Sequence, residues 1–464
     1  MTIGSARTRV LVVGGGYVGM YTALRLQKRL RAELRARRVE IIVVDPRSYM
    51  TYQPFLPEAA AGSLEPRHVV VPLRRVLPHC EVLTGRVEGV DHGRRVARIV
   101  PPRGAPYDLS YEVVVLAPGS VARTMPIPGL AEHGIGFKQV EEAIALRNQV
   151  LESLDLATTV TDHAARRALL TFVFVGGGYA GIEALAELED MAAYATRYYP
   201  GLSKGDIRFV LVEATGRILP EVGEDLGRYT VEQLRKRGIE VRLDTRLESC
   251  VGGHVVLSDG EEFDAETLVW TAGVKAHPML TRTDLPLDEK GRLRCQADLR
   301  VEGVEGAWSA GDCAAVPDLT AAAGATASPS AQHAVRQAKV LGDNIALVLH
   351  GREPRAYAHR HVGSVASLGM YKGVAQVYGV KLRGFPAWFM HRTYHVSRMP
   401  TLNRKIRVIL DWTLALFFRR EVVALGSLQH PREEFTEATA TSTRGATATS
   451  TRGATATSTG GAGP

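Results

Sequence analysis

Three glycines near the N-terminus, Gly14, Gly16 and Gly19, follow the apolar run RVLVV and precede a helical pattern. In a G-x-G-x-x-G pattern the first glycine makes a tight turn, the second lets the backbone approach a pyrophosphate, and the third lets helix and strand pack closely. The helix start then offers free N–H groups and a positive dipole end to the phosphates. Asp45 closes the next apolar run, VEIIVVD, where its carboxylate can accept both hydroxyls of an adenosine ribose. These residues predict a dinucleotide site.

The same unit occurs again in the middle of the chain. Gly176, Gly178 and Gly181 follow LTFVFV, and Glu213 closes the next apolar run, IRFVLVE. One glycine pattern can be only a turn, but two complete strand–turn–helix–strand–acid units imply two dinucleotides. The economical pair is a bound flavin, FAD, at the first unit and a visiting nicotinamide at the second. Because Glu213 would repel a 2′-phosphate, we expect NADH, with NADPH as the less favoured alternative through the nearby Arg217.

Two more strands run into turns of small residues. The strand near Val113–Ala117 is followed by Gly119, and the strand near Thr267–Ala272 is followed by Gly273. We expect Gly119 in the FAD site and Gly273 in the NAD site.

Together with SAGDC, Ser309–Cys313, the fingerprints resemble the flavoprotein reductases in which an NAD domain interrupts an FAD domain. SAGDC looks like the second FAD motif of that superfamily, whose aspartate, here Asp312, binds the ribityl chain. Within the superfamily the chain most resembles the type II NADH dehydrogenases, single-subunit NADH:quinone oxidoreductases, from residue 8 to about residue 430. The resemblance implies hydride transfer from NADH to flavin N5, then two-electron reduction of a membrane quinone without proton pumping.

The resemblance also implies residues close to the flavin and the quinone. Glu183, in the sequence GIE, stands where the family carries a glutamate beside both. Ala331–Ala338, AQHAVRQA, looks like the quinone-site motif, with its first alanine beside FAD and with Gln332 and Gln337 facing the quinone. A helix starting at Ser330 would also direct its positive dipole end at the flavin and stabilise its reduced form. The alternatives are an acid favoured by the helix dipole and a capped helix with surface glutamines.

These residues require an α/β scaffold with two Rossmann-like dinucleotide-binding domains. We expect the FAD domain at 8–150 and 296–350, the NAD domain at 151–295, a C-terminal membrane-association region at 351–430 and a disordered repeat tail at 431–464. The tail repeats ATATSTRG, which has too little apolar surface to offset the entropy of ordering. A long charged helix through Lys28–Arg38 would explain the wide spacing between the first glycine turn and Asp45.

Basic residues concentrate near the C-terminal end. The stretch from Lys381 to Arg420 holds nine Lys and Arg against one acid, a net charge of 9 − 1 = +8, which equals the net charge of the whole chain. Its apolar core, Val408–Phe418, is too short to cross about 30 Å of hydrocarbon. We expect residues 384–420 to lie on an anionic lipid surface. The membrane-facing side chains would be Trp412, Phe417, Phe418, Trp388, Phe389 and Tyr394, and those at headgroups Arg404, Lys405, Arg407, Arg419 and Arg420. The alternative is a helix buried in a homodimer.

Several other classes of protein lack their required residues. Residues 46–60 contain no cysteine, which excludes the redox pair of a disulfide reductase, and Cys313 has no second cysteine placed for a sulfide:quinone reductase. We expect no metal site, because no ligand cluster is present, and no nucleic-acid partner, because no recognised motif accompanies the basic stretch. Without a signal peptide or an apolar run of about 18 residues, the chain is expected to be peripheral, on the cytoplasmic side of the cell membrane.

Two rival functions remain beside quinone reduction. The first is an FAD-dependent NAD(P)H reductase with a soluble acceptor, a ferredoxin-like protein or a small xenobiotic, docked at the basic stretch. The second is a redox-sensing flavoprotein similar to the apoptosis-inducing flavoproteins. Steady turnover of NADH with a quinone distinguishes quinone reduction from the redox sensor.

Overall fold

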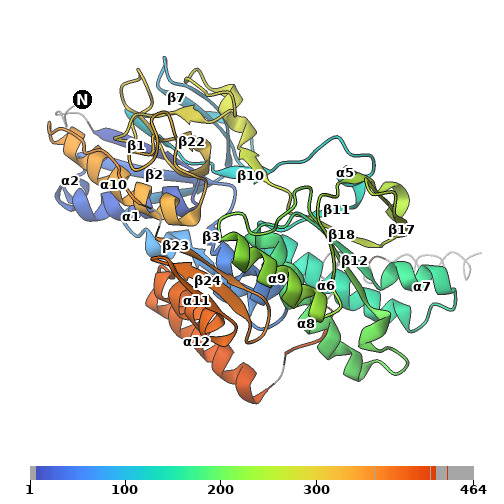
Figure 1. Ribbon diagram of the computed structural model, residues 1–464. Coiled ribbons are helices and arrows are strands. Elements are labelled where there is room, and N and C mark those ends of the chain that lie inside the picture. Colours follow the sequence, from blue (N-terminus) through green and yellow to red (C-terminus); the bar gives the residue numbers. More distant parts are fainter. Residues whose placement is uncertain (1–6, 361, 419, 425–435, 437–464) are drawn as a thin grey trace, which may run out of the picture.

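The computed structural model describes residues 7–360, 362–418, 420–424 and 436 of the chain. Two parallel sheets dominate it (Figure 1). The predicted repeat tail at 431–464, apart from residue 436, and Arg419 lie outside the described residues. The chain therefore has the α/β class that the sequence predicts, with two Rossmann-like units.

The first sheet has the strand order β21-β9-β1-β2-β5, and all four pairings are parallel. Nearly every residue of its central strands is buried, as expected for strands that are covered on both faces. Its strands are β1 (Thr8–Val13), β2 (Val39–Asp45), β5 (Glu81–Thr84), β9 (Val113–Leu116) and β21 (Ala307–Ser309). Because β21 joins this sheet after the second sheet is complete, the first unit is assembled from two distant stretches of chain.

Helices α1 (Tyr17–Arg29) and α10 (Ala331–Leu349) lie side by side against the first sheet (Figure 1). Arg25 and Arg29 of α1 both bond the Asp343 carboxylate of α10, at 2.7 and 2.6 Å. The single charged helix expected through residues 28–38 is wrong. The backbone leaves helical geometry at Leu30, where φ is −106° and ψ is 28°, and the short α2 (Arg31–Arg35) follows.

The second sheet has the order β11-β18-β12-β13-β14, again entirely parallel. Its strands are β11 (Gly134–Gly136), β12 (Thr171–Val175), β13 (Arg208–Val212), β14 (Glu240–Arg242) and β18 (Thr267–Trp270), with α6 (Val140–Ala157), α8 (Tyr179–Ala195) and α9 (Glu224–Lys236) against it. Strand β11 already belongs to this sheet, although it precedes residue 151, where the NAD domain was expected to begin. The expected domain limits stay predictions. The two connections between the sheets, β10 (Ser120–Ala122) and β19 (Val274–Ala276), pair antiparallel.

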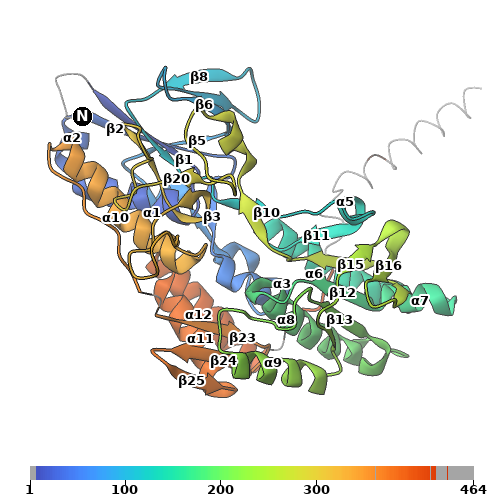
Figure 2. The ribbon, with the colours of Figure 1, turned by 45° about the horizontal axis from the view of Figure 1, so that its top comes forward.

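The C-terminal region lies below the first sheet and beside the second unit, as the two ribbon views show (Figures 1 and 2). A three-stranded antiparallel sheet, β23 (Gly363–Ser367), β24 (Gly373–Val377) and β25 (Val380–Arg383), precedes the helices α11 (Phe385–Arg398) and α12 (Leu402–Phe417). The sequence indicated the second of these helices, but neither the first helix nor this sheet. Among the described residues, none of the helices meets the length and hydropathy needed to cross a membrane.

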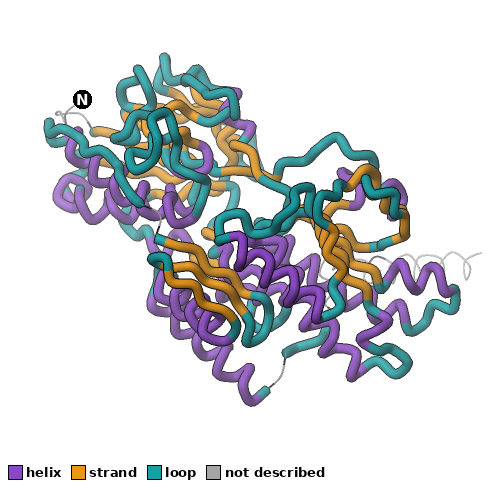
Figure 3. Tube along the Cα trace, viewed as in Figure 1, coloured by secondary structure: helices purple, strands orange, loops and turns teal. Residues whose placement is uncertain are grey.

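Smaller elements complete the two units (Figure 3). Antiparallel sheets lie beside each parallel sheet. The remaining strands and helices are β3 (Tyr49–Thr51), β4 (Val70–Pro72), β6 (Arg86–Asp91), β7 (Val96–Val100), β8 (Tyr107–Ser110), β15 (Leu247–Ser249), β16 (His254–Leu257), β17 (Glu262–Asp264), β20 (Leu293–Arg294), β22 (Ala314–Ala315), α3 (Leu56–Ala60), α4 (Leu73–Val76), α5 (Leu130–His133) and α7 (His163–Leu169).

Candidate active site

The first glycine fingerprint has the geometry that a dinucleotide needs. Gly14 has φ +96°, and a Cβ there would lie 2.3 Å from the carbonyl oxygen of Ala117. A Cβ on Gly19 would lie 1.7 Å from the Gly14 carbonyl oxygen, so only glycine allows α1 to pack this close to the turn. A Cβ on Gly16, by contrast, would meet nothing within 4 Å. Gly16 therefore leaves its backbone open to a ligand.

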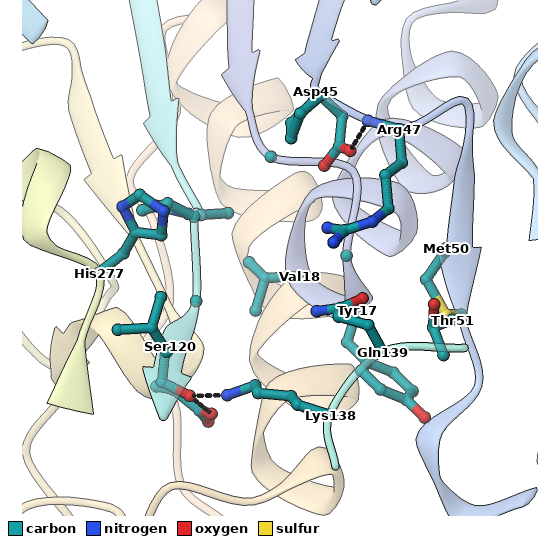
Figure 4. Close-up of a pocket in the computed structure, with 18 of the residues that line it drawn as sticks. Tyr17, Val18, Asp45, Arg47, Met50, Thr51, Ser120, Lys138, Gln139 and His277 are labelled. Carbon is teal, nitrogen blue, oxygen red and sulfur yellow. Dashed lines mark hydrogen bonds between the residues drawn. The ribbon is translucent and has the colours of Figure 1, made fainter. Parts of the chain in front are cut away.

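A cavity of about 480 Å³ opens in front of this fingerprint (Figure 4). Six of the predicted FAD residues line it: Gly14, Gly16, Asp45, Gly119, Asp312 and Ala331. Gly119 has φ +72° and, like Gly16, open space where a Cβ would stand. An elongated cavity with a helix N-terminus and two open glycines between two carboxylates fits FAD, whose sugar, pyrophosphate and ribityl groups offer partners to each.

Asp45 occupies one end of the cavity, at the end of β2. One of its carboxylate oxygens accepts a hydrogen bond from the backbone N–H of Gly15, at 2.6 Å. The other accepts from the backbone N–H of Arg47, at 2.7 Å (Figure 4). Burial raises the pKa of Asp45, and the two N–H donors offset part of that rise. The carboxylate is thus fixed in position beside the glycine turn, where it can still accept from the hydroxyls of a ribose.

At the opposite end, a hydrogen-bonded chain joins Asp312 to a lysine that sequence reasoning did not single out. The Ser120 hydroxyl donates to Asp312 Oδ2 at 2.6 Å, and Lys138 Nζ donates to the Ser120 oxygen at 2.5 Å (Figure 4). Burial lowers the pKa of Lys138, although Asp312 and Glu142 act to raise it. His277 also lines the cavity, and burial lowers its pKa, with Lys138 adding to the effect. This end can place a cation and hydroxyl donors around the redox-active part of a cofactor.

The second fingerprint repeats the geometry of the first. Gly176 has φ +112°, a Cβ on Gly181 would lie 2.2 Å from the Gly176 carbonyl oxygen, and Gly178 has open space around it. Gly273, with φ +90° and equally open, follows β18. The N-terminus of α8 is thus prepared for a pyrophosphate in the same way as that of α1.

Glu213 is held at the end of β13 by three donors. Its Oε2 accepts from the Gly177 N–H at 2.6 Å, and its Oε1 accepts from the backbone and the hydroxyl of Thr215, both at 2.8 Å. Arg217 Nη2 instead donates to the carbonyls of Pro220 and Val222, the second at 3.1 Å. The Arg217 guanidinium is therefore bonded to backbone carbonyls. The side chain left to meet an adenosine ribose at the end of β13 is the carboxylate of Glu213.

Helix α10 begins as predicted, with the Ser330 hydroxyl accepting from the His333 N–H at 3.2 Å. The two glutamines of the quinone-site motif, however, have partners in different places, and neither lines the cavity. Gln337 is 2% exposed, and its Oε1 accepts from the Gly311 N–H at 2.7 Å. Gln332 donates to the carbonyl of Gly363 at 3.3 Å, and its oxygen accepts from the Val362 N–H at 3.2 Å. Gln337 therefore supports the loop that carries Asp312.

Glu183 lies in α8 and is buried, but its carboxylate faces the C-terminal region. Oε1 accepts from the Ser367 N–H at 2.9 Å and lies 3.0 Å from His391 Nε2 of α11. Both side chains are almost completely enclosed, with His391 at 2% exposure. Sequence reasoning missed His391, because its partner is 208 positions away (391 − 183) and no local pattern marks it.

The C-terminal helices bind the core through buried acids. Glu58 of α3 accepts from Arg392 Nη2 at 2.9 Å and from Trp412 Nε1 at 2.6 Å. Burial raises the pKa of Glu58, while Arg392 acts to lower it. Glu187 of α8 is fully enclosed and accepts from Arg420 Nη2 at 2.9 Å. Trp412 and Arg420 therefore face the protein, and their predicted placement in lipid and at headgroups is wrong.

The opposite side of α12 exposes a band of large apolar side chains. Trp388 of α11 does not belong to this band, because it is only 6% exposed, and its prediction as a membrane anchor is wrong. Every third or fourth position of α12 contributes to the band, which is the spacing of one helix face. Its exposed members, with two from α11, are Leu402, Ile406, Ile409, Leu410, Leu414, Leu416, Phe417, Phe418, Phe385 and Phe389. Leu402 and Phe417 are 72% and 77% exposed, so nothing in the described chain covers this face.

Among the described residues, no group of three His, Cys, Asp or Glu side chains could hold a metal ion. All four cysteines are free thiols, and burial raises the pKa of Cys313 to about 11. A thiol whose pKa is raised is more fully protonated and a weaker nucleophile at neutral pH.

The fold, the two fingerprints and the cavity define a pyridine-nucleotide flavoprotein. Residues 8–338 match the pyridine nucleotide-disulphide oxidoreductase family, and the chain belongs to it. Within that family it belongs to the type II NADH:quinone oxidoreductases. It is 30% identical over 393 residues to the type II NADH:quinone oxidoreductase of Staphylococcus aureus, covering 83% of this chain and 94% of the relative. The family membership that the sequence motifs indicated is confirmed.

Two further comparisons agree with this assignment. The chain is 27% identical over 420 residues to a probable NADH dehydrogenase of Dictyostelium discoideum, covering 89% of this chain and 90% of the relative. Its fold matches that of NDH2 from Plasmodium falciparum, solved in complex with NADH, with a TM-score of 0.83 at 16% identity. That match covers 90% of this chain and the whole of the other.

Proposed function

We propose that this chain is an FAD-dependent NADH:quinone oxidoreductase that works at a membrane surface without pumping protons. The single observation that carries the proposal is the pair of matched fingerprints in one family member, one of them opening into a cavity that fits FAD. When bound, FAD supplies the capacity to accept a hydride and to release two electrons to a second substrate. The chain supplies binding, orientation and electrostatics.

Each site residue has a role that follows from its contacts. Gly14, Gly16 and Gly19 bring α1 to the FAD pyrophosphate, and Asp45 holds the adenosine ribose. Gly119, Asp312 and Ala331 hold the ribityl and ring end, where Lys138 places a buried positive charge. The corresponding NADH residues are Gly176, Gly178, Gly181, Glu213 and Gly273.

The acceptor side is assigned to Glu183 and the start of α10. Glu183 and Gln332 both contact the segment around β23, Glu183 through Ser367 and Gln332 through Gly363, so this segment joins the two residues. Gln337 contributes indirectly, through the loop before Asp312. Quinone reduction is favoured over a soluble acceptor because an exposed apolar helix face borders this region.

An absorption spectrum of the purified protein, followed by anaerobic addition of NADH, tests the proposal. We expect a flavin spectrum that bleaches with NADH and returns when a soluble quinone such as ubiquinone-1 is added. Protein without flavin, or flavin that NADH does not bleach, would contradict the FAD and NADH assignments. Bleaching without return on quinone addition would favour the redox-sensing alternative.

The exposed band on α11 and α12 is proposed to dock on anionic lipid at the cytoplasmic side of the cell membrane. Apolar side chains would enter the interface while neighbouring basic residues, Arg398, Lys405 and Arg407, meet headgroups. We expect sedimentation with vesicles containing phosphatidylglycerol and loss of that binding in Leu416→Ser/Phe417→Ser, with reduction of ferricyanide unchanged. A dimer that the same double substitution converts to a monomer, without vesicle binding, would assign the band to a homodimer interface instead.

A further inference from the structure

His391 has an unusual environment for a buried histidine. Its imidazole is 2% exposed, and among the described residues neither ring nitrogen forms a hydrogen bond. Nε2 lies 3.0 Å from Glu183 Oε1, but the ring is not aligned for a bond along that line, so the contact is electrostatic. A buried polar nitrogen without a partner costs free energy, unless a ligand supplies the partner during function.

Three elements supply groups close to the ring: α11 itself, α8 and α3. His391 and His395 of the same helix have their ring centroids 4.5 Å apart, and burial lowers the pKa of His395 well below its ordinary value, with His391 lowering it further. His395 is therefore neutral at pH 7. From the neighbouring elements, the charged groups that face His391 are Glu183 of α8 and Glu58 of α3. Glu58 is already bonded to Arg392, which leaves Glu183 as the carboxylate that acts most directly on His391.

A chain of aromatic contacts connects this ring to the cofactor cavity. Tyr17 lines the cavity, and its ring centroid lies 6.0 Å from that of Tyr52. The Tyr52 hydroxyl donates to the His395 carbonyl oxygen at 3.0 Å. On its other side α11 exposes Phe385 and Phe389, so an apolar substrate that arrives from a bilayer meets this helix. His391 thus lies between the apolar face and the cavity.

The overall reaction requires a proton that NADH does not supply. Oxidation of NADH releases a hydride, which carries two electrons and one hydrogen, whereas a quinone takes two electrons and two protons to become a quinol. The balance is NADH + H⁺ + quinone → NAD⁺ + quinol, so one proton per turnover must come from the protein or the solvent. A general acid at the acceptor site accelerates such a step on the order of 10²-fold or more.

On the basis of the proposed function, we infer that His391 is the general acid that gives the second proton to the quinone. Glu183 stabilises the imidazolium from the Nε2 side, and Nδ1 donates to a quinone oxygen. In the step an N–H bond of His391 breaks, its electron pair stays on the nitrogen, and an O–H bond of the quinol forms. The ring then regains a proton from solvent.

The test is an anaerobic stopped-flow comparison of the wild type with His391→Gln, in which glutamine can contact Glu183 but cannot transfer a proton near neutral pH. Flavin bleaching by NADH is measured first, then reoxidation by ubiquinone-1 and, separately, by ferricyanide, which takes electrons without protons. We expect normal bleaching, ferricyanide reoxidation close to wild type, and ubiquinone-1 reoxidation slower by on the order of 10²-fold. The wild-type rate with ubiquinone-1 should fall with rising pH and in D₂O, and the variant should lose both dependences.

His350→Gln is the matched control, because His350 Nε2 also lies 2.9 Å from a carboxylate, that of Glu33, but at the surface. It should change none of these rates. Equal losses with ubiquinone-1 and ferricyanide in His391→Gln would make His391 structural and overturn the inference. If His391→Gln loses FAD, the test rests on the wild type alone. A wild-type rate of reoxidation by ubiquinone-1 that does not change with pH or in D₂O would then contradict a protein acid. Failure of the wild type to bleach with NADH would instead overturn the proposed function.

Discussion

Replacing Gln337 with leucine separates two roles for this glutamine. By resemblance it faces the quinone, whereas its Oε1 accepts the Gly311 N–H at 2.7 Å from a position that is 2% exposed. Leucine has nearly the same size but no acceptor, so the Gly311 N–H would remain buried and unpaired. Leaving such a donor unpaired costs about 1–3 kcal/mol. Because Gly311 directly precedes Asp312, we expect this cost to appear in FAD affinity, as roughly 5- to 140-fold weaker binding at about 1.4 kcal/mol per factor of ten.

The assay is a titration of the Gln337→Leu apoprotein with FAD, followed by flavin fluorescence, and then measurement of quinone KM at saturating FAD. Gln332→Leu is the matched control, since it makes the same substitution on α10 at a residue that contacts the segment 362–363 instead of the Asp312 loop. Its FAD affinity should stay close to wild type. Unchanged FAD affinity together with a raised quinone KM in Gln337→Leu would refute the structural role and return this residue to the quinone site.

Three further perturbations test other parts of the site. Gly16→Val should fold, because its Cβ meets no protein atom within 4 Å, but should purify with little FAD; full occupancy would show that Gly16 does not face the cofactor. Wild type should prefer NADH over NADPH by at least ~10-fold in kcat/KM, about 1.4 kcal/mol, and Glu213→Gln should narrow that ratio. Equal kcat/KM values for the two nucleotides in wild type would contradict the assignment of Glu213 to the adenosine ribose. For Asp343, burial acts to raise the pKa, but hydrogen bonds from Arg25 and Arg29 outweigh it and lower the pKa. The stabilisation is therefore present above the unfolded pKa of about 3.9 and lost as pH falls through the lower folded value. Asp343→Asn should lower the free energy of unfolding at pH 7 by about 1 kcal/mol or less, and this difference from wild type should shrink as the pH falls below about 3.9, as urea titrations across that range would reveal.

The parts of the site that the sequence predicted are those built by short stretches of chain. Each glycine turn, the helix after it and the acid at the next strand end lie within one strand–helix–strand unit, so their spacing determines their geometry. Asp45 and Glu213 even make the same bond, each accepting from the N–H of the glycine that lies between the first two glycines of its fingerprint, Gly15 and Gly177. The start of α10 at Ser330 was predictable for the same reason, because the cap lies beside the helix it begins.

The errors arise where distant segments decide the orientation of a side chain. Gln332 and Gln337 are five positions apart, about 140° around an α-helix, so a helix cannot direct both at one ligand. Trp412 and Arg420 read as membrane residues from composition alone, but their partners, Glu58 and Glu187, lie in the first and second units. Lys138 and His391 carried no local signal, since their neighbours in space come from other parts of the chain.

The bonds from the last helices to buried acids also determine when the protein can finish folding on the ribosome. Glu187 is made 233 residues before its partner Arg420, a delay of roughly 10 to 50 s at about 5–20 residues per second. During that interval the nascent chain cannot close around Glu187 without leaving its charge unpaired, which costs about 3–5 kcal/mol. A message that ends before codon 420 therefore yields a chain with an incompletely closed core, which quality-control proteases can recognise, although both dinucleotide fingerprints have already been translated.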